Sequence, residues 1–151
     1  MKSIFESNFE GFKEYPTLEN NLETEAAVVG GGAAGLLCAY WLNSEGYKVT
    51  VFEAGRIAAG TTAKSTATLT ALQSIMYGEL IKKNKHIGDY FEAQRDALEI
   101  YKQIIDKHNI ECDFETKPAY LYASDMKGQK ELLKEYKAMK NFTDSVEYTK
   151  S

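Results

Sequence analysis

Cysteine is scarce in this chain, a surplus of basic residues is absent, and no hydrophobic run is long enough to span a bilayer. Cys38 and Cys112 are the only two cysteines among 151 residues, and they offer neither a disulfide framework nor the spacing of a zinc site. The most apolar candidate helix, 33–44, is too short to cross a membrane. These absences argue against a disulfide-stapled secreted domain and a membrane-spanning protein, and they favour a reducing, cytoplasmic setting.

The charge balance is mildly acidic. The formal net charge is −4 and the basic residues do not cluster, so neither nucleic acid nor an anionic membrane surface is expected as a partner. Residues 1–15 alternate charged and aromatic side chains and lack the apolar core of a signal peptide. With 44% hydrophobic and 26% charged residues the composition is that of a globular protein, long enough for one domain with a core.

A strand, a helix and a second strand are predicted close together in the first third of the chain. The apolar run Ala26–Val29 is typical of a buried strand. Helical spacing of apolar residues begins at Ala33, and Gly46 is placed to end that helix. Residues 48–53 alternate like a second strand and end on an acidic residue. We therefore predict one right-handed βαβ unit with parallel strands.

The rest of the chain is predicted to be mainly helical. Residues 58–70 are typical of a loop that leads into a short helix. A longer amphipathic helix is predicted from side chains at three-, four- and seven-residue spacings: Ile87, Phe91, Leu98, Tyr101, Ile105 and His108. The segments "CDFE" from Cys112 and "AYLYAS" from Ala119 are predicted to pair as short strands, with Tyr120 and Tyr122 packed in the hairpin. A last helix is predicted after Asp125.

Glycine is concentrated where the first strand turns into the first helix. Gly30, Gly32 and Gly35 form the pattern G-x-G-x-x-G. In a dinucleotide site the first glycine permits the tight turn, the second lets a pyrophosphate approach the backbone, and the third brings helix and strand together. The helix N-terminus offers free N–H groups to the phosphates. Glu53, about 20 residues on, can accept hydrogen bonds from the ribose hydroxyls and would repel a 2′-phosphate.

A glycine-rich turn without a ligand is the alternative interpretation, but the second strand and its terminal acid favour a bound dinucleotide. These features alone hardly separate FAD from NAD. The hydroxyl-rich loop after Glu53 could serve the ribityl and phosphate oxygens of a flavin, or it could simply cap the next helix. The candidate cofactor-binding residues are Gly30, Gly32, Ala34, Gly35, Glu53, Ala54, Arg56, Thr61, Thr62, Ser65 and Thr66.

The predicted fold class is α/β: the N-terminal part of a Rossmann-like FAD/NAD(P)-binding domain, followed by helices and a short strand pair. Residues 1–22 form an irregular lead-in, and residues 23–75 hold the βαβ unit and the loop after it. Residues 76–151 form a helical and strand segment that leads into an incomplete substrate domain. Two parallel strands cannot make a covered sheet alone, so we expect the chain to be truncated.

The chain resembles the N-terminal part of the FAD-dependent oxidoreductases of the D-amino-acid oxidase type. More narrowly, it is similar to the branch that carries a Rieske iron–sulfur domain at its C-terminus. The resemblance runs from about Tyr15 to Ser124, and "RIAAGTT" and "CDFE" are its most specific segments. In that branch a Gln-His pair often follows the Thr-Ala segment, whereas here Gln73 is followed by Ser74.

This resemblance implies FAD as the cofactor. Gly30, Gly32 and Gly35 would take its pyrophosphate and Glu53 its adenosine ribose. Arg56 would lie near the adenine. The hydroxyl residues of the following loop would run toward the flavin: Thr61, Thr62, Ser65 and Thr66.

Two classes of function follow. In the first, the parent polypeptide is a flavoenzyme that oxidises an amine or amino acid and passes electrons to oxygen or to an iron–sulfur partner. In the second, the chain is a non-catalytic remnant; an NAD-binding module is a third, weaker option. No catalytic residue is assigned, because His86 and His108 are predicted to be helix-terminal or surface residues. Cys38 is predicted to be a core thiol and Cys112 a partly buried strand residue.

Overall fold

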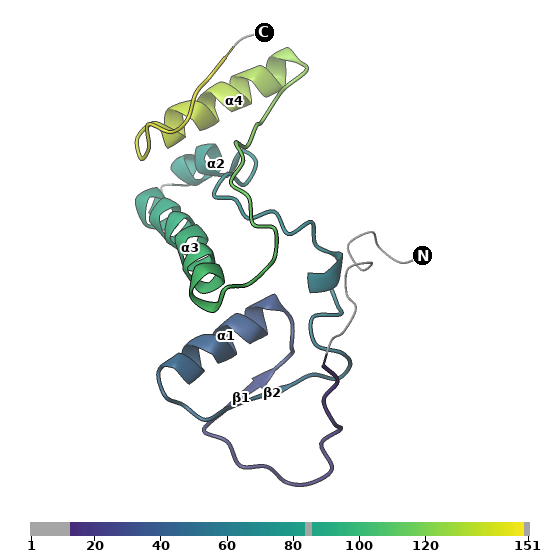
Figure 1. Ribbon diagram of the computed structural model, residues 1–151. Coiled ribbons are helices and arrows are strands. Elements are labelled where there is room, and N and C mark those ends of the chain that lie inside the picture. The colour runs from purple at the N-terminus through teal and green to yellow at the C-terminus, as the bar shows by residue number, and fades with distance from the viewer. Residues whose placement is uncertain (1–12, 84–85, 150–151) are drawn as a thin grey trace. The chain divides into compact units, whose positions relative to one another are not determined.

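The computed structural model describes residues 13–83 and 86–149. The chain divides into two compact units, the first ending at Thr68 and the second beginning at Leu69. The first unit holds the short sheet, and the second is built from helices (Figure 1). The division falls a few residues before the boundary expected after residue 75, because Leu72 packs on the core of the second unit.

The first unit contains the predicted strand–helix–strand arrangement. Strand β1 (Ala26–Val29) is followed by helix α1 (Ala33–Ser44) and strand β2 (Val49–Phe52). The strands are parallel neighbours, with Ala26 opposite Val49 and Val29 opposite Phe52. The βαβ prediction is therefore confirmed.

Helix α1 ends at the predicted glycine. Gly46 has a φ of +93°, a left-handed conformation that suits glycine. Its N–H donates to the Asn43 carbonyl at 3.0 Å, and the Tyr47 N–H donates to the Leu42 carbonyl at 3.1 Å. This pair of bonds is the Schellman motif, which satisfies carbonyls that the helix leaves without partners.

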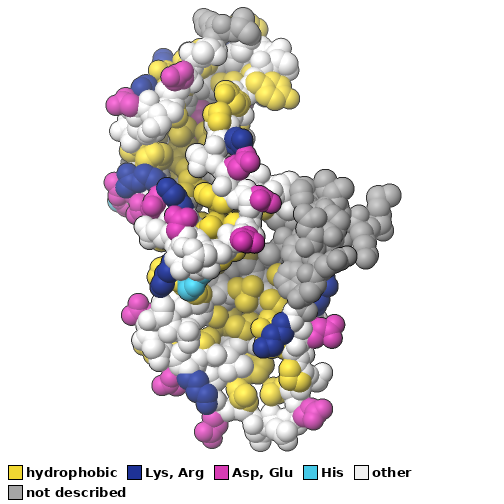
Figure 2. All heavy atoms as spheres, in the orientation of Figure 1, with side chains coloured by type: hydrophobic (Ala, Val, Ile, Leu, Met, Phe, Trp, Pro, Cys, Tyr) yellow, Lys and Arg dark blue, Asp and Glu magenta, His cyan; other side chains and the backbone are white. Residues whose placement is uncertain are grey.

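The first unit buries little of its apolar surface. Helix α1 has no fully buried residue, and 87% of the surface of Val29 remains exposed. Figure 2 shows hydrophobic side chains at the molecular surface. Parallel sheets are ordinarily covered on both faces, so the described part of this unit leaves apolar sheet surface uncovered.

Among its described residues, the second unit contains three helices. Helix α2 spans Met76–Lys82, α3 spans Ile87–His108 and α4 spans Met126–Met139. Asp125 caps α4, because its Oδ1 accepts from the Gly128 N–H at 2.7 Å. The buried core of this unit consists of Tyr77, Phe91, Ala138 and Met139.

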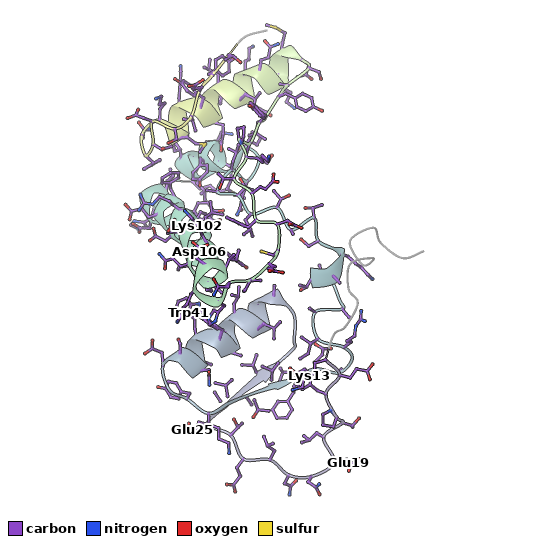
Figure 3. All side chains as sticks on the ribbon, viewed as in Figure 1. Lys13, Glu19, Glu25, Trp41, Lys102 and Asp106 are labelled. Carbon is purple, nitrogen blue, oxygen red and sulfur yellow. The ribbon has the colours of Figure 1, made fainter. Side chains whose placement is uncertain are left out.

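The prediction of a long amphipathic helix is confirmed by α3, which has one apolar side. Phe91 is buried, and Ile87, Leu98, Tyr101 and Ile105 are partly buried. Lys102 and Asp106, labelled in Figure 3, lie one turn apart on the exposed side. His108 departs from the predicted stripe, because as the last residue of the helix it is exposed.

The predicted strand pair is wrong. Residues 112–124 contain no strand, and Tyr120 and Tyr122 are 82% and 91% exposed rather than packed in a hairpin. An extended segment becomes a strand only when a neighbour takes its backbone hydrogen bonds. Asp113 has a φ of +50°, which takes the first segment out of the extended conformation. Pro118 precedes the second segment and has no N–H to donate to a neighbouring strand.

Both cysteine predictions also fail, because Cys38 and Cys112 are free and exposed. Cys38 lies on a helix without a buried residue, and Cys112 lies in the unpaired segment. Both predictions fail for the same physical reason. Each cysteine was expected to pack against an apolar layer, and the described residues do not supply that layer. No helix in the described ranges is long and apolar enough to cross a membrane.

Candidate functional site: a glycine turn between strand and helix

The glycine turn joins β1 to α1 by a close approach of backbone to backbone. Gly30 has a φ of +105°, and its N–H donates to the Phe52 carbonyl of β2 at 2.7 Å. A Cβ added to Gly35 would overlap the Gly30 carbonyl oxygen. The helix can therefore begin this close to the strand only because residue 35 has no side chain.

The first turn of α1 is suited to an anion. Gly32 is its N-cap residue and makes no side-chain cap, and no acidic residue occurs in the first turn. Ala34 lies in this turn and is exposed. The N–H groups at a helix N-terminus have no partner within the helix and carry a partial positive charge. Phosphate oxygens are well matched to such a turn.

Glu53 is held against the glycine turn. Its Oε2 accepts from the Gly31 N–H at 2.8 Å, and its Oε1 accepts from the Gly55 N–H at 2.9 Å. The Gly31 N–H, and after it the Gly55 and Ala54 N–H groups, lower the pKa of this carboxyl from its usual 4.5 because they stabilise the charged form. The acid predicted at the end of the second strand therefore stays ionised beside the turn.

The loop after Glu53 folds back over the glycine turn. The Ala58 N–H donates to the Gly31 carbonyl at 2.8 Å, and Ala58 has a φ of +58°, which is unfavourable for a residue with a Cβ. The Thr62 hydroxyl accepts from the Ala33 N–H, the first of α1, at 3.0 Å. Sequence reasoning missed this contact, because it places a threonine in a loop without fixing its partner.

The other hydroxyl candidates make local contacts within their own loop. The Ser65 hydroxyl accepts from the Ala67 N–H at 3.1 Å, and the Thr66 hydroxyl lies 3.3 Å from the Thr68 hydroxyl. Thr61 precedes the short 3₁₀ helix η2 (Thr62–Lys64) and makes no side-chain cap there. The structure thus brings together the three glycines, Glu53 and Thr62, and leaves the later hydroxyls in local contacts.

A buried carboxylate lies in the second unit. Glu135 on α4 is 3% exposed, and its two oxygens accept from the Tyr77 N–H at 2.9 Å and the Gly78 N–H at 2.5 Å. It therefore caps the N-terminus of α2 from another helix. Burial raises the pKa of the neighbouring Tyr77 hydroxyl, which donates to the Ala71 carbonyl at 2.9 Å. Sequence analysis missed Glu135, because its partners lie 57 and 58 positions away.

A groove of about 670 Å³ also lies in the second unit. Its lining includes Tyr120, Tyr122, Tyr136 and Tyr148, so the exposed tyrosine pair contributes to an aromatic surface. Within the described ranges, no group of three or more His, Cys, Asp or Glu side chains could hold a metal ion.

A parallel βαβ unit with this turn, a helix N-terminus free of acids and a carboxylate at the end of the second strand defines part of a Rossmann-like dinucleotide-binding domain. Residues 25–148 match the family of FAD-dependent oxidoreductases named DAO. The chain belongs to this family, whose cofactor is FAD. The resemblance found in the sequence is thereby confirmed.

Two curated relatives match as well. A protein of Bacillus subtilis (strain 168), named as a Rieske 2Fe-2S iron–sulfur protein, is 33% identical over 126 residues, which cover 82% of this chain and 25% of the relative. The beta subunit of an NADP(+)-dependent formate dehydrogenase of Moorella thermoacetica is 41% identical over 56 residues, covering 37% of this chain and 8% of the relative. The chain thus spans a quarter or less of either relative. No solved structure gave a significant match.

Proposed function

We propose that the glycine turn binds the adenosine diphosphate half of FAD. In this assignment the first turn of α1 and the glycines hold the pyrophosphate, and Glu53 accepts from the adenosine ribose hydroxyls. The observation that carries the proposal is the Glu53 carboxylate, ionised and fixed beside the turn by the Gly31 and Gly55 N–H groups. A carboxylate with both oxygens on backbone donors still has lone pairs for hydroxyl groups.

The residues present fit this cofactor sterically and electrostatically. Gly30 and Gly35 have no side chain where helix and strand meet, and no acid in the first turn of α1 opposes a phosphate. The negative charge of the Glu53 carboxylate would repel a 2′-phosphate on the ribose. The chain is therefore expected to disfavour NADP, although one relative is named for that cofactor. The remaining proposed contacts along the cofactor are Ala54, Arg56, Thr61, Thr62, Ser65 and Thr66.

The parent activity we propose is oxidation of an amine or amino acid. Bound FAD supplies the acceptor for a hydride equivalent. The residues described here bind and orient the dinucleotide, and no catalytic residue is assigned among them. An iron–sulfur group is the proposed electron acceptor besides oxygen, because one relative is named as a Rieske 2Fe-2S protein.

The proposed location is the cytoplasm, which agrees with two free, exposed cysteines.

The first experiment is an absorption spectrum of the purified chain after incubation with FAD and desalting. A retained flavin band is expected, and it should be lost in Glu53→Arg and Gly32→Val, which place a charge or a side chain in the proposed site. Gly60→Ala is the matched control, because a Cβ at residue 60 meets open space. A folded chain that takes up no flavin would overturn the proposal.

The same experiment separates the other two functions. A chain that remains colourless with FAD but binds NAD in a fluorescence titration would be a nicotinamide-binding module. A folded chain that binds neither dinucleotide would be a non-catalytic remnant. Turnover of an amine by the isolated chain would instead place the whole activity within these 151 residues.

A further inference from the structure

The connection between α3 and α4 (Figure 1) contains a short segment whose sequence is the same in both directions. Residues 119–123 read Ala-Tyr-Leu-Tyr-Ala, centred on Leu121. Among the described residues, no backbone–backbone hydrogen bond involves this segment, and Tyr120, Leu121 and Tyr122 are exposed. All five residues line the groove of about 670 Å³, so open space lies alongside them. The segment therefore combines strand-forming side chains with a free backbone edge.

We propose that this segment pairs antiparallel with the same segment of a second copy of the chain, across a two-fold axis at Leu121. A two-fold contact is self-complementary, so every pair of residues occurs twice. Here Tyr120 lies opposite Tyr122 of the second copy, and Ala119 lies opposite its Ala123. The segment belongs to the second unit, so the inference is independent of the proposed FAD site.

The side chains match in this register. Alternate residues of a strand point to opposite faces, so the two tyrosines share one face, and Leu121 shares the other with the alanines. Each tyrosine of one copy meets a tyrosine of the other, and cross-strand aromatic pairs stabilise a sheet. The pairing also removes from water the Tyr120 and Tyr122 side chains, which are 82% and 91% exposed in the single chain.

The proline beside the segment also suits this register. Hydrogen-bonded and non-hydrogen-bonded pairs alternate along antiparallel strands, and side chains lie closer in the second kind. With Leu121 in a hydrogen-bonded pair, the tyrosines take the closer positions, and Pro118 falls in a non-hydrogen-bonded pair. The position of its missing N–H then faces away from the second copy, and no bond between the copies is lost.

Charge complementarity favours a second copy as the occupant. No charged residue lies between Lys117 and Asp125, and the antiparallel register sets Lys117 opposite Asp125 of the second copy. A parallel pairing would instead set like charges against each other. Asp125 still has an extended backbone, with φ −130° and ψ 166°. In the single chain Lys117 pairs with Glu115 at 2.6 Å, but both side chains are mostly exposed, and such a pair contributes little.

The first test is sedimentation equilibrium of the purified chain from micromolar to millimolar concentration. The mass is expected to rise with concentration from 16.9 kDa toward twice that value. Leu121→Pro removes the N–H of the central pair in both copies and should weaken the dimer at least about tenfold, as the loss of two hydrogen bonds implies. Glu111→Pro is the matched control, because Glu111 is exposed in the same connection but lies outside the paired segment. Circular dichroism checks that both variants keep their helices.

A disulfide at the axis tests the register. In a chain with Cys38→Ser and Cys112→Ser, Leu121→Cys brings two thiols together, because opposite residues in a hydrogen-bonded pair have Cα atoms about 5.5 Å apart, within the span of a disulfide. This variant should form a covalent dimer on mild oxidation. Ser124→Cys is the control, since its two copies stand about 20 Å apart in the same register, and it should stay monomeric on a non-reducing gel.

Each outcome decides the inference. A dimer that Leu121→Pro weakens and Glu111→Pro does not, with linkage at residue 121 alone, supports it. A chain that stays monomeric at millimolar concentration overturns it, and protected amides at 119–123 in such a monomer would show that another part of the same chain covers the segment. A dimer insensitive to Leu121→Pro, or equal linkage at 121 and 124, overturns it as well, because the copies then meet through another surface or register.

Discussion

At Gly35 a single methyl group decides whether helix α1 can start where it does. A Cβ at this position would overlap the Gly30 carbonyl oxygen, which is backbone and cannot rotate away. We therefore expect Gly35→Ala to destabilise the first unit by about 1–3 kcal/mol, the range for overpacked sites, and to weaken FAD binding.

The sole tryptophan makes this measurable. Trp41, labelled in Figure 3, lies on α1 within the first unit, so its fluorescence during urea unfolding follows that unit. Gly60→Ala is the control and should unfold like the unmodified chain, because nothing lies within 4 Å of a Cβ there. Equal unfolding midpoints for both variants would show that α1 shifts away from β1 at no cost.

Glu53 should make the first unit sensitive to acid. Its pKa is lowered from 4.5 by the Gly31 N–H and then the Gly55 N–H. A carboxyl whose pKa falls on folding adds stability that is fully present above its unfolded pKa and lost as the pH drops through the folded value. The urea midpoint followed at Trp41 should therefore decline below pH 4.5, and more steeply in the unmodified chain than in Glu53→Gln. Parallel curves would contradict this role.

The residue types at the turn could be predicted from the sequence, but the loop contacts could not. Gly30, Gly35 and Glu53 stand at offsets that a strand–helix–strand unit imposes, so a local pattern sufficed to find them. The bond between Thr62 and Ala33 depends on how a loop folds back across 29 positions. Several hydroxyl residues of similar chemistry lie in that loop, and spacing alone does not choose between them.

At the scale of elements, helix α2 depends on a side chain from α4. This helix has seven residues, too few to be stable by itself, and the Glu135 carboxylate binds two of its first N–H groups. We expect Glu135→Ala to destabilise the second unit by about 2–3 kcal/mol, because it leaves buried donors without a charged partner. Glu135→Gln, which keeps one acceptor oxygen, should cost less.

Urea unfolding followed by circular dichroism tests this, since most helical residues belong to the second unit. Glu131→Ala is the matched control on the same helix. Glu131 is only partly buried, and its removal should change stability by no more than about 0.5 kcal/mol. An equal loss in both variants would mean that removing a carboxylate from α4, rather than uncapping α2, causes the effect.

Helices were easier to predict than strands in this chain for a physical reason. The hydrogen bonds of α3 and α4 lie within each helix, so their apolar periodicity was enough to find them. Residues 112–124 alternate like strands, but a strand needs a neighbour that the sequence of the segment does not contain. Pro118 and Asp113 weaken the proposed pairing further, and the segment stays without a partner within the described chain.

At the scale of the whole molecule, the two units differ in how much they bury. The second unit has a core of Tyr77, Phe91, Ala138 and Met139, whereas Ala63 is the only buried hydrophobic residue described in the first. Burial of apolar surface is the main source of stability. The free energy of unfolding should therefore be lower for the first unit than for the second. A bound cofactor stabilises the state that binds it.

Hydrogen exchange should therefore show two levels of protection. Without FAD, the amides of α1 and β2 are expected to exchange faster than those of the inner turns of α3 and α4. With saturating FAD, protection should rise at β1, α1 and β2 and stay constant in the second unit, because the proposed contacts all lie in the first. A uniform rise along the chain would mean that both units unfold as one cooperative body, and a constant pattern would mean that the cofactor does not bind at the glycine turn.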